Sequence, residues 1–581
     1  MGRAIWDGEK IVLDKSRVNL EQLQKVIDKY HGVEMPNFGY CFDRTVDLVL
    51  ELIAVDGVVI DESFKKIVEV SKKVQQKRLN EIESLDLPEC MYPFQKQSVA
   101  QMLKMNGNIL LSSDMGTGKS LMSIMYLRKH GNSFPAVVVC PALLKLNWQM
   151  EFEKWCPDVK TYVINGRESY MSPYVVEEAK DVDVTIINYD ILGKENKELA
   201  EKEKERIKIA KENGWKYRKA FIPTSGWVDV YNDVIKPKLV ICDECQYIES
   251  SKAIRTRAVI QITKNDKTKK LFLSGTPFET RVAQFYNACH ILAPDMFPDE
   301  YKFLYRYCDP KYNGFGWQFK GVSNLEELRH KLSFFMIRHR KEDVLSQLPK
   351  KQKIPIYFEM EKKFRKHYDD METELTTKKD GISVLSYLAE MKKALLEVKK
   401  DLVVEYLKDM LDIENKIVVF TYHTEMYNYL MEKFKGISVG INGSVAALKR
   451  QDAVNQFQKN EKIKLFVGQV QAASVGLTLT ASHTVVFTEW GNTVAQMAQA
   501  EDRICRIGQE ADRCVIYYLV IKDTIDEAPL STLNNHAGDI NAVMNGTDEK
   551  MVDLNDMMIA KVKERRLLAG RKAMKIDYGE L

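Results

Sequence analysis

The sequence predicts an α/β protein with two parallel-sheet lobes, helical insertions and an accessory N-terminal region. Two separate series of short apolar runs, each alternating with helical patterns, predict the two sheets. The length of 581 residues exceeds what one hydrophobic core organises. A hydrophobic content of 45% with 29% charged residues is typical of folded globular proteins rather than of disordered chains.

The apolar runs fall between residues 90 and 290 and between residues 416 and 520. Runs without polar alternation are typical of parallel strands that are buried on both faces. The first series comprises ILLS (109–112), AVVVC (136–140), VTIIN (184–188), KLVIC (238–242) and KLFLS (270–274). The second comprises KIVVFT (416–421), KLFVG (464–468), TVVFTE (484–489) and CVIYYLV (514–520). Two parallel sheets with helical crossovers are therefore expected.

These patterns divide the chain into five parts. We expect an accessory N-terminal domain at residues 1–85, a first lobe at 86–290, a mostly helical insertion or linker at 291–400, a second lobe at 401–527 and a helical tail at 528–581. A charged stretch at 194–219 predicts a solvated helical protrusion from the first lobe. Residues 1–85 carry no chemical motif, and contact with a protein partner is one role open to them.

Composition argues against several classes of protein. The net charge of +4 creates no global field for nucleic acid, so phosphate contacts must come from local clusters. No apolar run reaches the roughly 18 residues of a membrane span, and the start lacks a signal-peptide pattern. We expect an intracellular protein without a membrane partner, cytoplasmic in a bacterium or virus and nuclear in a eukaryote. The one CxxC, at 242–245, lacks further metal ligands, which argues against zinc.

The stretch SSDMGTGKS (112–120) follows an apolar run and opens a helical pattern, which is the context of a phosphate-binding loop. Glycines let backbone N–H groups close around phosphates, a lysine reaches the β and γ phosphates, and a hydroxyl ligates Mg²⁺. The alternative is an ordinary glycine-rich turn. The residues expected to bind ATP here are Met115, Gly116, Thr117, Gly118, Lys119 and Ser120, with Ser120 also a Mg²⁺ ligand.

Two carboxylates end the apolar run in LVICDECQ (239–246), where the second half of a nucleotide site is expected. Asp243 would hold Mg²⁺ through water, and Glu244 would orient and deprotonate the attacking water. Acidic residues at strand ends are also common capping groups. The acidic pair therefore indicates a nucleotide site only in combination with the phosphate loop. On the loop after the next run, Ser274 and Thr276 could hydrogen-bond the acidic motif and relay the nucleotide state.

The second series of runs has no phosphate loop, but it carries QAEDRICRIGQ (499–509). Arg503 and Arg506 are three residues apart and share a helical face. Two guanidinium groups suit the spread negative charge of a phosphoryl-transfer transition state. The alternative is a surface pair bridging to Glu501 or Asp502. One phosphate site in the first lobe and an arginine pair in the second imply a single ATP held between the lobes.

Taken in order, these motifs resemble those of the SWI/SNF-type, or Snf2-like, ATPases related to superfamily 2 helicases, most closely the annealing-helicase branch. The further matching stretches are YPFQKQSV (92–99), VVVCPALLKLNWQMEFEKW (137–155), SGTPFETRVAQFYN (274–287), FMIRHRKEDVLSQLPKK (335–351) and INGSVAALKRQDAVNQFQ (441–458). The resemblance implies two RecA-like lobes, ATP and Mg²⁺ as cofactors, and adenine recognition by Gln95. It also implies a coupling role for Gln246, which stands where the family usually has His.

The resemblance further implies a DNA-stimulated ATPase that moves along double-stranded or branched DNA and remodels or rewinds it. A strand-separating DNA or RNA helicase and a nucleotide-binding scaffold without catalysis are the alternatives. We expect a monomer that binds duplex, forked or otherwise branched DNA independently of sequence. For two of the residues expected to contact DNA, Trp148 and Tyr189, a purely structural role as buried aromatic residues of the core is an equal alternative. The expected DNA contacts are Lys145, Asn147, Trp148, Asn188, Tyr189, Thr421, His423, Ser474 and Gly476.

Overall fold

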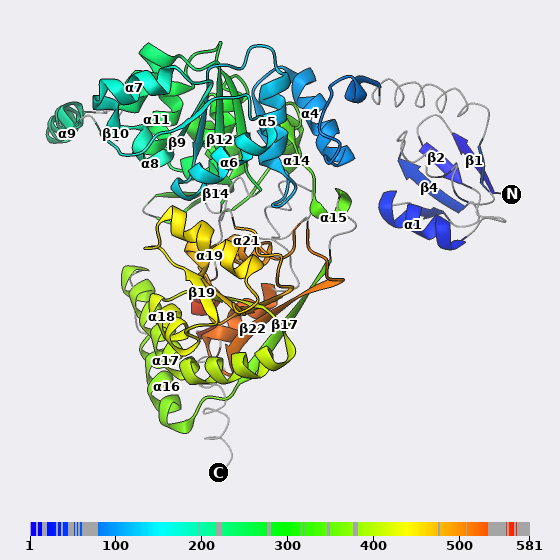
Figure 1. Cartoon of the computed structure of the whole chain (residues 1–581), viewed down its shortest axis with the longest axis vertical. Coiled ribbons are helices and arrows are strands. Elements are labelled where there is room, and N and C mark those ends of the chain that lie inside the picture. The colour runs from blue at the N-terminus through cyan, green and yellow to red at the C-terminus, as the bar shows by residue number, and fades with distance from the viewer. Residues whose placement is uncertain are drawn as a thin grey trace. The chain divides into compact units, whose positions relative to one another are not determined.

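The structure is a computed structural model, and Figure 1 shows the course of its chain. Its described residues are 2–6, 10–13, 20–30, 33–35, 39–43, 52, 55, 58–60, 80–195, 197–215, 223–275, 281–314, 316–319, 321–344, 349–375, 381–473, 477–506, 508–532, 554, 557–562 and 565. The chain forms two compact units, residues 1–100 and residues 101–581. Among the described helices, none combines the length and apolar character needed to cross a membrane.

The first unit contains a five-stranded sheet with the order β3-β4-β2-β1-β5. Strand β1 pairs antiparallel with β2 and parallel with β5, and β4 pairs antiparallel with β2 and β3. Helix α1 (Leu20–Tyr30) buries Leu23 and Val26, which lie on one helical face. The strands are β1 (Gly2–Trp6), β2 (Lys10–Leu13), β3 (Val33–Met35), β4 (Gly39–Asp43) and β5 (Val58–Ile60).

The first lobe is built on a seven-stranded sheet with the order β16-β6-β13-β12-β7-β9-β8. Every adjacent pair is parallel. All five apolar runs of the first series form strands here, and burial on both faces explains their lack of polar alternation. The strands are β6 (Ile109–Leu111), β7 (Ala136–Cys140), β8 (Thr161–Val163), β9 (Val184–Asn188), β12 (Leu239–Asp243), β13 (Lys269–Leu273) and β16 (Met336–Ile337).

Helices connect these strands and pack around the sheet (Figure 1). Local sequence sets their ends: Pro173 starts α7, and the Ser172 hydroxyl accepts from the backbone N–H of Val175. The charged stretch forms α9, which lies outside the body of the lobe in Figure 1, next to the two-stranded ribbon of β10 (Lys194–Glu195) and β11 (Thr224–Ser225). The helices are α5 (Lys119–Lys129), α6 (Lys145–Trp155), α7 (Pro173–Lys180), α8 (Tyr189–Leu192), α9 (Lys197–Glu212), α10 (Trp227–Asp229), α11 (Ile254–Ile262) and α12 (Tyr286–Leu292).

The second lobe is built on a six-stranded parallel sheet with the order β17-β22-β21-β18-β20-β19. All four runs of the second series are strands, so the predicted α/β class with two parallel sheets is confirmed. The strands are β17 (Lys350–Phe358), β18 (Ile417–Thr421), β19 (Ser438–Ile441), β20 (Leu465–Gln469), β21 (Thr484–Phe487) and β22 (Arg513–Ile521). The helices are α16 (Lys362–Leu375), α17 (Gly381–Ile413), α18 (Thr424–Lys433), α19 (Ala447–Lys459), α20 (Val470–Ala473) and α21 (Val494–Glu501).

The segment between the two sheets, residues 291–400, contains strands as well as the expected helices. Strand β16 joins the first sheet beside β6, and β17 joins the second beside β22, so one segment contributes to both sheets. These strands carry little sequence signal, because β16 has two residues and β17 begins with charged residues. The remaining elements are α13 (Glu300–Tyr307), β14 (Pro310–Tyr312), β15 (Trp317–Phe319), α14 (Leu325–Leu332) and α15 (Lys341–Val344).

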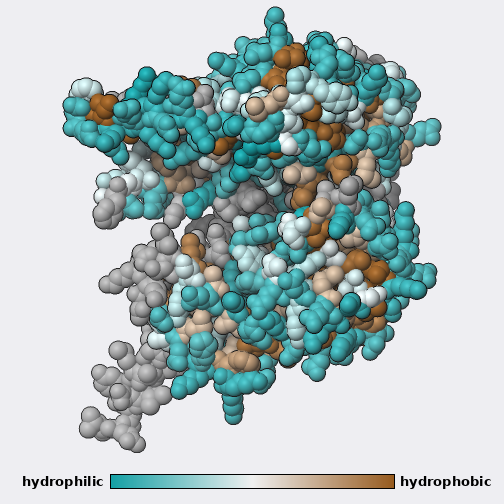
Figure 2. All heavy atoms as spheres, turned by 60° about the vertical axis from the view of Figure 1, so that its left-hand side comes forward, coloured by the Kyte–Doolittle hydropathy of each residue, from teal (hydrophilic) through white to brown (hydrophobic). Residues whose placement is uncertain are grey.

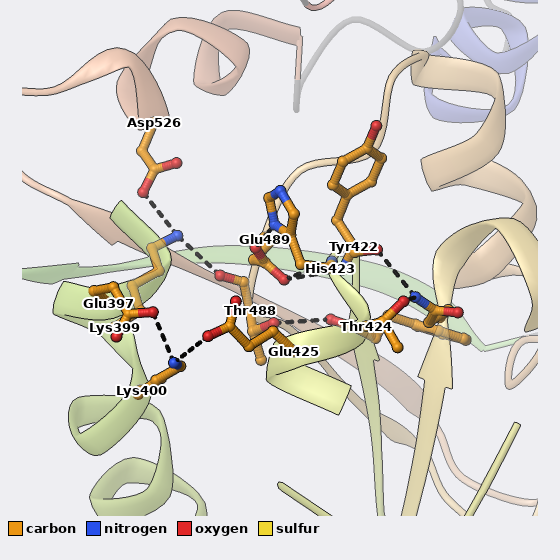
Figure 3. A network of polar contacts seen from close by, with 12 residues as sticks. Glu397, Lys399, Lys400, Tyr422, His423, Thr424, Glu425, Thr488, Glu489 and Asp526 are labelled. Carbon is orange, nitrogen blue, oxygen red and sulfur yellow. Dashed lines mark hydrogen bonds and ion pairs between the residues drawn. The ribbon is translucent and has the colours of Figure 1, made fainter. Parts of the chain in front are cut away.

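A buried ion pair fixes the long helix α17 against the second sheet. Lys399 is 1% exposed and Asp526 is 6% exposed. The ammonium group lies 2.7 Å from an Asp526 carboxylate oxygen and donates to the carbonyls of Thr488 and Leu519 at 2.8 and 2.7 Å. Figure 3 shows Lys399 between Asp526 and Thr488. All three ammonium protons therefore have acceptors, as a buried charge requires.

Replacing Asp526 with Ala should lower the free energy of unfolding by about 3–5 kcal/mol, because Lys399 would stay buried without its counter-charge. Urea denaturation measures the change. Glu397→Ala is the matched control, since Glu397 lies on the same helix and pairs with Lys400 with its side chain about half exposed. Its loss should be at most about 0.5 kcal/mol. Equal losses in the two variants would contradict the assignment.

Candidate functional site

The phosphate loop connects β6 to α5, and two of its glycines have backbone conformations that favour glycine. Gly116 has φ of 78° and Gly118, which caps α5, has φ of 85°. These left-handed conformations turn the chain so that the first backbone N–H groups of α5 face the loop. Met115 and Thr117 are buried at its base, and the Thr117 hydroxyl donates to the carbonyl of Asp114 at 2.7 Å. The loop is thus shaped to receive an anion at a helix N-terminus.

Lys119 and the following Ser120 begin helix α5. The Lys119 ammonium donates to the loop carbonyls of Ser113 and Asp114 at 2.8 and 3.2 Å. Burial lowers the pKa of Lys119, while the nearby carboxylates of Glu244 and Asp243 oppose that shift. The lysine therefore lies between the phosphate loop and the acidic pair, as its expected role requires.

The acidic pair lies at the end of β12. Asp243 accepts from the indole N–H of Trp148 at 2.8 Å and from the backbone N–H of Glu244 at 3.0 Å. Burial, together with the charge of Glu244, raises the pKa of Asp243 to about 7, although the Trp148 bond and Lys119 oppose the shift. A carboxylate in such surroundings is stabilised by an additional cation. This property fits the donor set of a divalent metal.

Gln246 connects the acidic pair to the loop after β13. Its amide N–H donates to a carboxylate oxygen of Glu244 at 2.9 Å, and its amide oxygen accepts from the Ser274 hydroxyl at 2.8 Å. Both Gln246 and Ser274 are buried. The amide therefore bridges the two motifs that were expected to communicate. Thr276, the third residue expected in this relay, lies outside the described residues.

The arginine pair of the second lobe faces the phosphate loop of the first. Arg503 is 1% exposed, and its guanidinium lies 3.6 Å from the Met115 sulfur. A Cβ atom added at Gly116 would lie 3.3 Å from Arg506 Cγ. Burial lowers the pKa of both guanidinium groups, and the charge of Glu244 opposes the shift in each. Residues from both lobes therefore meet at one site.

The alternative of a surface pair bridging to neighbouring acids is wrong, because Arg503 is buried and both acids pair with lysines. Glu501 lies 3.1 Å from Lys351 and 2.9 Å from Lys353. Although burial opposes ionisation, these two lysines lower the pKa of Glu501 to about 2. Asp502 likewise lies 2.8 Å from Lys351. The arginines are thereby left to face the first lobe.

Lys341, at the start of α15, contacts both sides of this site and was missed in the sequence. Its backbone N–H donates to a carboxylate oxygen of Asp114 at 3.0 Å. Its ammonium lies 2.8 Å from Asp502 and donates to the carbonyl of Cys505 at 2.9 Å. A Cβ atom added at Gly116 would lie 3.6 Å from that ammonium nitrogen. The only signal was its place in the matching stretch 335–351.

Two aromatic residues expected at DNA support the acidic pair from the protein interior instead. Trp148 and Tyr189 are each 1% exposed. The Tyr189 hydroxyl donates to the carbonyl of Asp243 at 2.8 Å, and its ring stacks on Tyr247 with centroids 5.4 Å apart. These contacts favour the core role that the sequence left open for both aromatics.

The other expected DNA contacts of the first lobe differ in exposure. The Lys145 ammonium is turned inward and donates to the carbonyl of Ile164 and the side chain of Asn165 at 2.8 and 2.6 Å. Asn188 is 6% exposed at the end of β9, whereas Asn147 is half-buried on α6. Asn147 is thus the most accessible of the three.

In the second lobe, His423 is the accessible member of the expected set. Its Nδ1 atom lies 2.5 Å from a Glu489 carboxylate oxygen, and its side chain is 25% exposed (Figure 3). Glu489 also accepts the backbone N–H groups of Tyr422 and His423, which fixes the loop after β18. Thr421 is fully buried at the strand end. Ser474 and Gly476 lie outside the described residues.

Gln95, the expected adenine contact, is described within the first unit. It lies near the start of α4 (Pro93–Met105) and is 3% exposed. Its side-chain oxygen accepts from the backbone N–H of Tyr92 at 2.9 Å. This bond fixes the side chain of Gln95 at the start of the helix.

The models of two protein families together match most of the chain. The SNF2-related domain matches residues 94–435, and the helicase conserved C-terminal domain matches residues 398–508. Together they cover both lobes and every described residue of the nucleotide site.

Among curated proteins, the human DNA annealing helicase and endonuclease ZRANB3 is 30% identical over 475 residues, covering 79% of this chain and 41% of the relative. A SWI/SNF-related matrix-associated actin-dependent regulator of chromatin subfamily A-like protein 1 from Xenopus tropicalis is 29% identical, covering 80% and 46%. The chain thus spans less than half the length of these relatives.

A solved structure, the Sulfolobus solfataricus SWI2/SNF2 ATPase core in complex with dsDNA, aligns with a TM-score of 0.36 and 22% identity over 77% of this chain and 91% of that chain. The family match extends over more than half of the residues and contains the phosphate loop, the acidic pair and the arginine pair. The chain therefore belongs to the SNF2-related ATPases with a helicase C-terminal domain and is an ATP hydrolase.

Proposed function

We propose that this ATP hydrolase is stimulated by DNA, translocates along double-stranded or branched DNA, and remodels or rewinds it. The observation that carries the proposal is the approach of Arg503 and Arg506 to the phosphate loop of the other lobe. A triphosphate held there touches both lobes, so its hydrolysis changes the contact between them. The names of the relatives, DNA annealing helicases among them, support DNA as the partner.

In the proposed reaction, Glu244 accepts a proton from the water that attacks the γ-phosphate and orients that water. Lys119 and the loop N–H groups hold the β and γ phosphates, and the two arginines offset the charge that develops during transfer. Gln246 fixes the Glu244 carboxylate and links it to Ser274, so the acidic pair and the loop after β13 respond together. Gln95 binds adenine.

We assign Mg²⁺ to Ser120 and Asp243. Ser120 and Asp243 would hold the ion, which would supply positive charge against the negative charge that develops during phosphoryl transfer. The part of the chain that the structure describes contains no cluster of three or more His, Cys, Asp or Glu side chains able to hold a metal by themselves. This donor set fits an ion that binds through one or two protein groups together with substrate phosphates. The raised pKa of Asp243 fits it as well.

Sequence-independent DNA binding is assigned to groups on the segments that follow strands in both lobes, chiefly the side chains of Asn147, Asn188 and His423. The Glu489 carboxylate accepts the Nδ1–H group of His423, which leaves Nε2 to accept from a bound water that in turn hydrogen-bonds a phosphate. Thr421, Ser474, Gly476 and the inward-turned Lys145 belong to the same proposal, in which Trp148 and Tyr189 act as supports.

The scaffold alternative was motivated by altered positions at Gln246 and Ser474, and Gln246 keeps a bridging role. A glutamine amide offers one donor end and one acceptor end, as a neutral imidazole does, and here both are used. Replacement of the usual histidine therefore keeps the bridge intact. Strand separation is left as the rival activity, which a displacement assay on forked DNA distinguishes from rewinding.

Replacing Glu244 with Gln should lower kcat for ATP hydrolysis by about 10²-fold or more while ATP still binds, because the general base is lost and the shape is kept. A coupled phosphate-release assay with nucleotide binding measured in parallel tests this. Glu153→Gln, an exposed change on α6, is the control and should be silent. Equal turnover by wild type and Glu244→Gln would support the scaffold instead.

We also propose Lys341 as a positioning residue. Lys341→Met should lower kcat by about 10- to 100-fold and change KM for ATP little, because Asp502 and the arginine turn would no longer be held at the phosphate loop. Lys353→Met is the matched control, because Lys353 is similarly buried and pairs with Glu501. Lys341→Arg should recover much of the rate. An equal fall in kcat for Lys353→Met would contradict the positioning role and indicate that Lys341 only stabilises the fold.

Stimulation by DNA is tested by measuring ATP turnover with no polymer, single-stranded DNA, linear duplex, forked DNA and RNA. We expect duplex and forked DNA to raise kcat, with RNA ineffective. The effect should weaken with rising salt, because backbone phosphates supply most of the binding free energy. Turnover that no DNA stimulates would overturn the proposal.

A further inference from the structure

The chain segment that joins the two sheets carries an aromatic surface that the nucleotide site does not use. It is formed by α13 and by the hairpin of β14 and β15. Three of its rings are largely accessible: Tyr305 is 41% exposed, Tyr312 61% and Trp317 53%. The Trp317 ring contacts both others, with centroids 5.3 Å from Tyr305 and 5.5 Å from Tyr312. These three residues form what we name the aromatic platform.

The platform is held by well-defined hydrogen bonds. Tyr312 and Trp317 lie opposite each other in the antiparallel register. The hairpin turn is closed by the backbone N–H of Asn313, which donates to the carbonyl of Gly316 at 3.1 Å. At its base, the Ser323 hydroxyl donates to the carbonyl of Arg306 at 2.8 Å. Rings that are ordered in advance lose little conformational entropy when they bind a partner.

Three exposed aromatic rings on one surface are unusual unless a partner covers them. Hydrophilic side chains predominate on the face shown in Figure 2, where hydrophobic ones form separate groups. The exposed neighbours of the platform include Lys302, Arg306 and Lys311, and an aromatic surface beside such charged groups fits a ligand that is flat on its faces and polar at its edges. Nucleobases have this character, and each stacks on a protein ring regardless of its identity.

The charges around the platform favour an anionic partner. Lys302 lies one turn before Tyr305 on α13, is exposed, and forms no ion pair within the described part of the chain. Two neighbouring carboxylates are neutralised, because Asp309 pairs with Lys311 and Glu327 with Arg306, while the Asp299 carboxylate accepts the backbone N–H of Lys302. A phosphate can therefore approach Lys302 without meeting an unpaired acid from these two positions.

A cavity of about 460 Å³ adjoins the platform, with Tyr305, Lys302 and Arg306 of α13 on one side and Lys331 of α14 on the other. Its volume lies within the range of pockets that enclose small organic ligands. A base that leaves the stack can enter it while its phosphate meets the lysines. The cavity and the platform share Tyr305, so both serve the same strand.

We propose that the aromatic platform stacks unpaired bases of branched DNA, which directs the motor to forks and junctions. The inference rests on the proposed DNA-stimulated function and specifies its substrate. In a linear duplex the base faces are covered by their neighbours, so only an unpaired strand presents them to the rings. The platform therefore adds affinity for a fork and none for a blunt duplex.

The test measures binding of the full chain to a fork with single-stranded arms and to a blunt linear duplex of equal length. The combined change Tyr312→Ala and Trp317→Ala should weaken fork binding about tenfold or more, from two lost stacking contacts, and change duplex binding less than about twofold. Fork-stimulated ATP turnover should shift to higher DNA concentration, with the maximal rate kept. The phenylalanine pair, Tyr312→Phe and Trp317→Phe, should retain fork binding.

Tyr174→Ala removes a ring that is 72% exposed on α7 and serves as the matched control. Unchanged fork binding in the double alanine variant would overturn the inference and point to a protein as the partner of this surface. Equal weakening for fork and duplex would overturn it as well. Failure of the wild-type chain to bind either DNA would instead overturn the proposed function on which it rests.

Discussion

Two guanidinium groups from the second lobe lie against the phosphate loop of the first, where burial removes most of their hydration. Arg503 is almost fully buried, and burial lowers the pKa of both arginines. Such a site is unfavourable for cations unless negative charge is present. Glu244 supplies part of that charge within the protein. In the proposed complex the phosphates of ATP would supply far more, which would favour the closed arrangement of the lobes.

The segment that joins the two sheets contributes directly to this arrangement. Its strand β16 extends the first sheet, its strand β17 extends the second, and Lys341 lies between them. The backbone of Lys341 binds Asp114 beside the phosphate loop, while its side chain pairs with Asp502 next to the arginines. A displacement of either lobe would therefore change the contacts of Lys341 with Asp114 or with Asp502. The segment is a structural part of both lobes and also the connection between them.

Polar groups around the acidic pair form a network in which each buried member has a partner. Trp148 and Tyr189 bind Asp243 through its side chain and its backbone, and Gln246 joins Glu244 to Ser274. In a medium of low dielectric these bonds fix the carboxylates more firmly than water would. The glutamine shows that the bridge depends on having one donor and one acceptor in the correct places. It does not depend on an imidazole.

Sequence alone determined the features whose physics is local. Unbroken apolar runs identified nine of the thirteen strands of the two sheets, all but β8, β16, β17 and β19. The glycines before Lys119 identified a loop with positive φ angles, which glycine adopts without strain. The acidic pair was equally visible, because it directly follows a strand. Tertiary structure decided the rest: the inward position of Trp148 and Tyr189, the contact of Lys341 with Asp502, and the grouping of Tyr305 with Trp317. These relations join residues far apart in the chain, and burial and ion pairing depend on which surfaces meet, which no short stretch of sequence specifies.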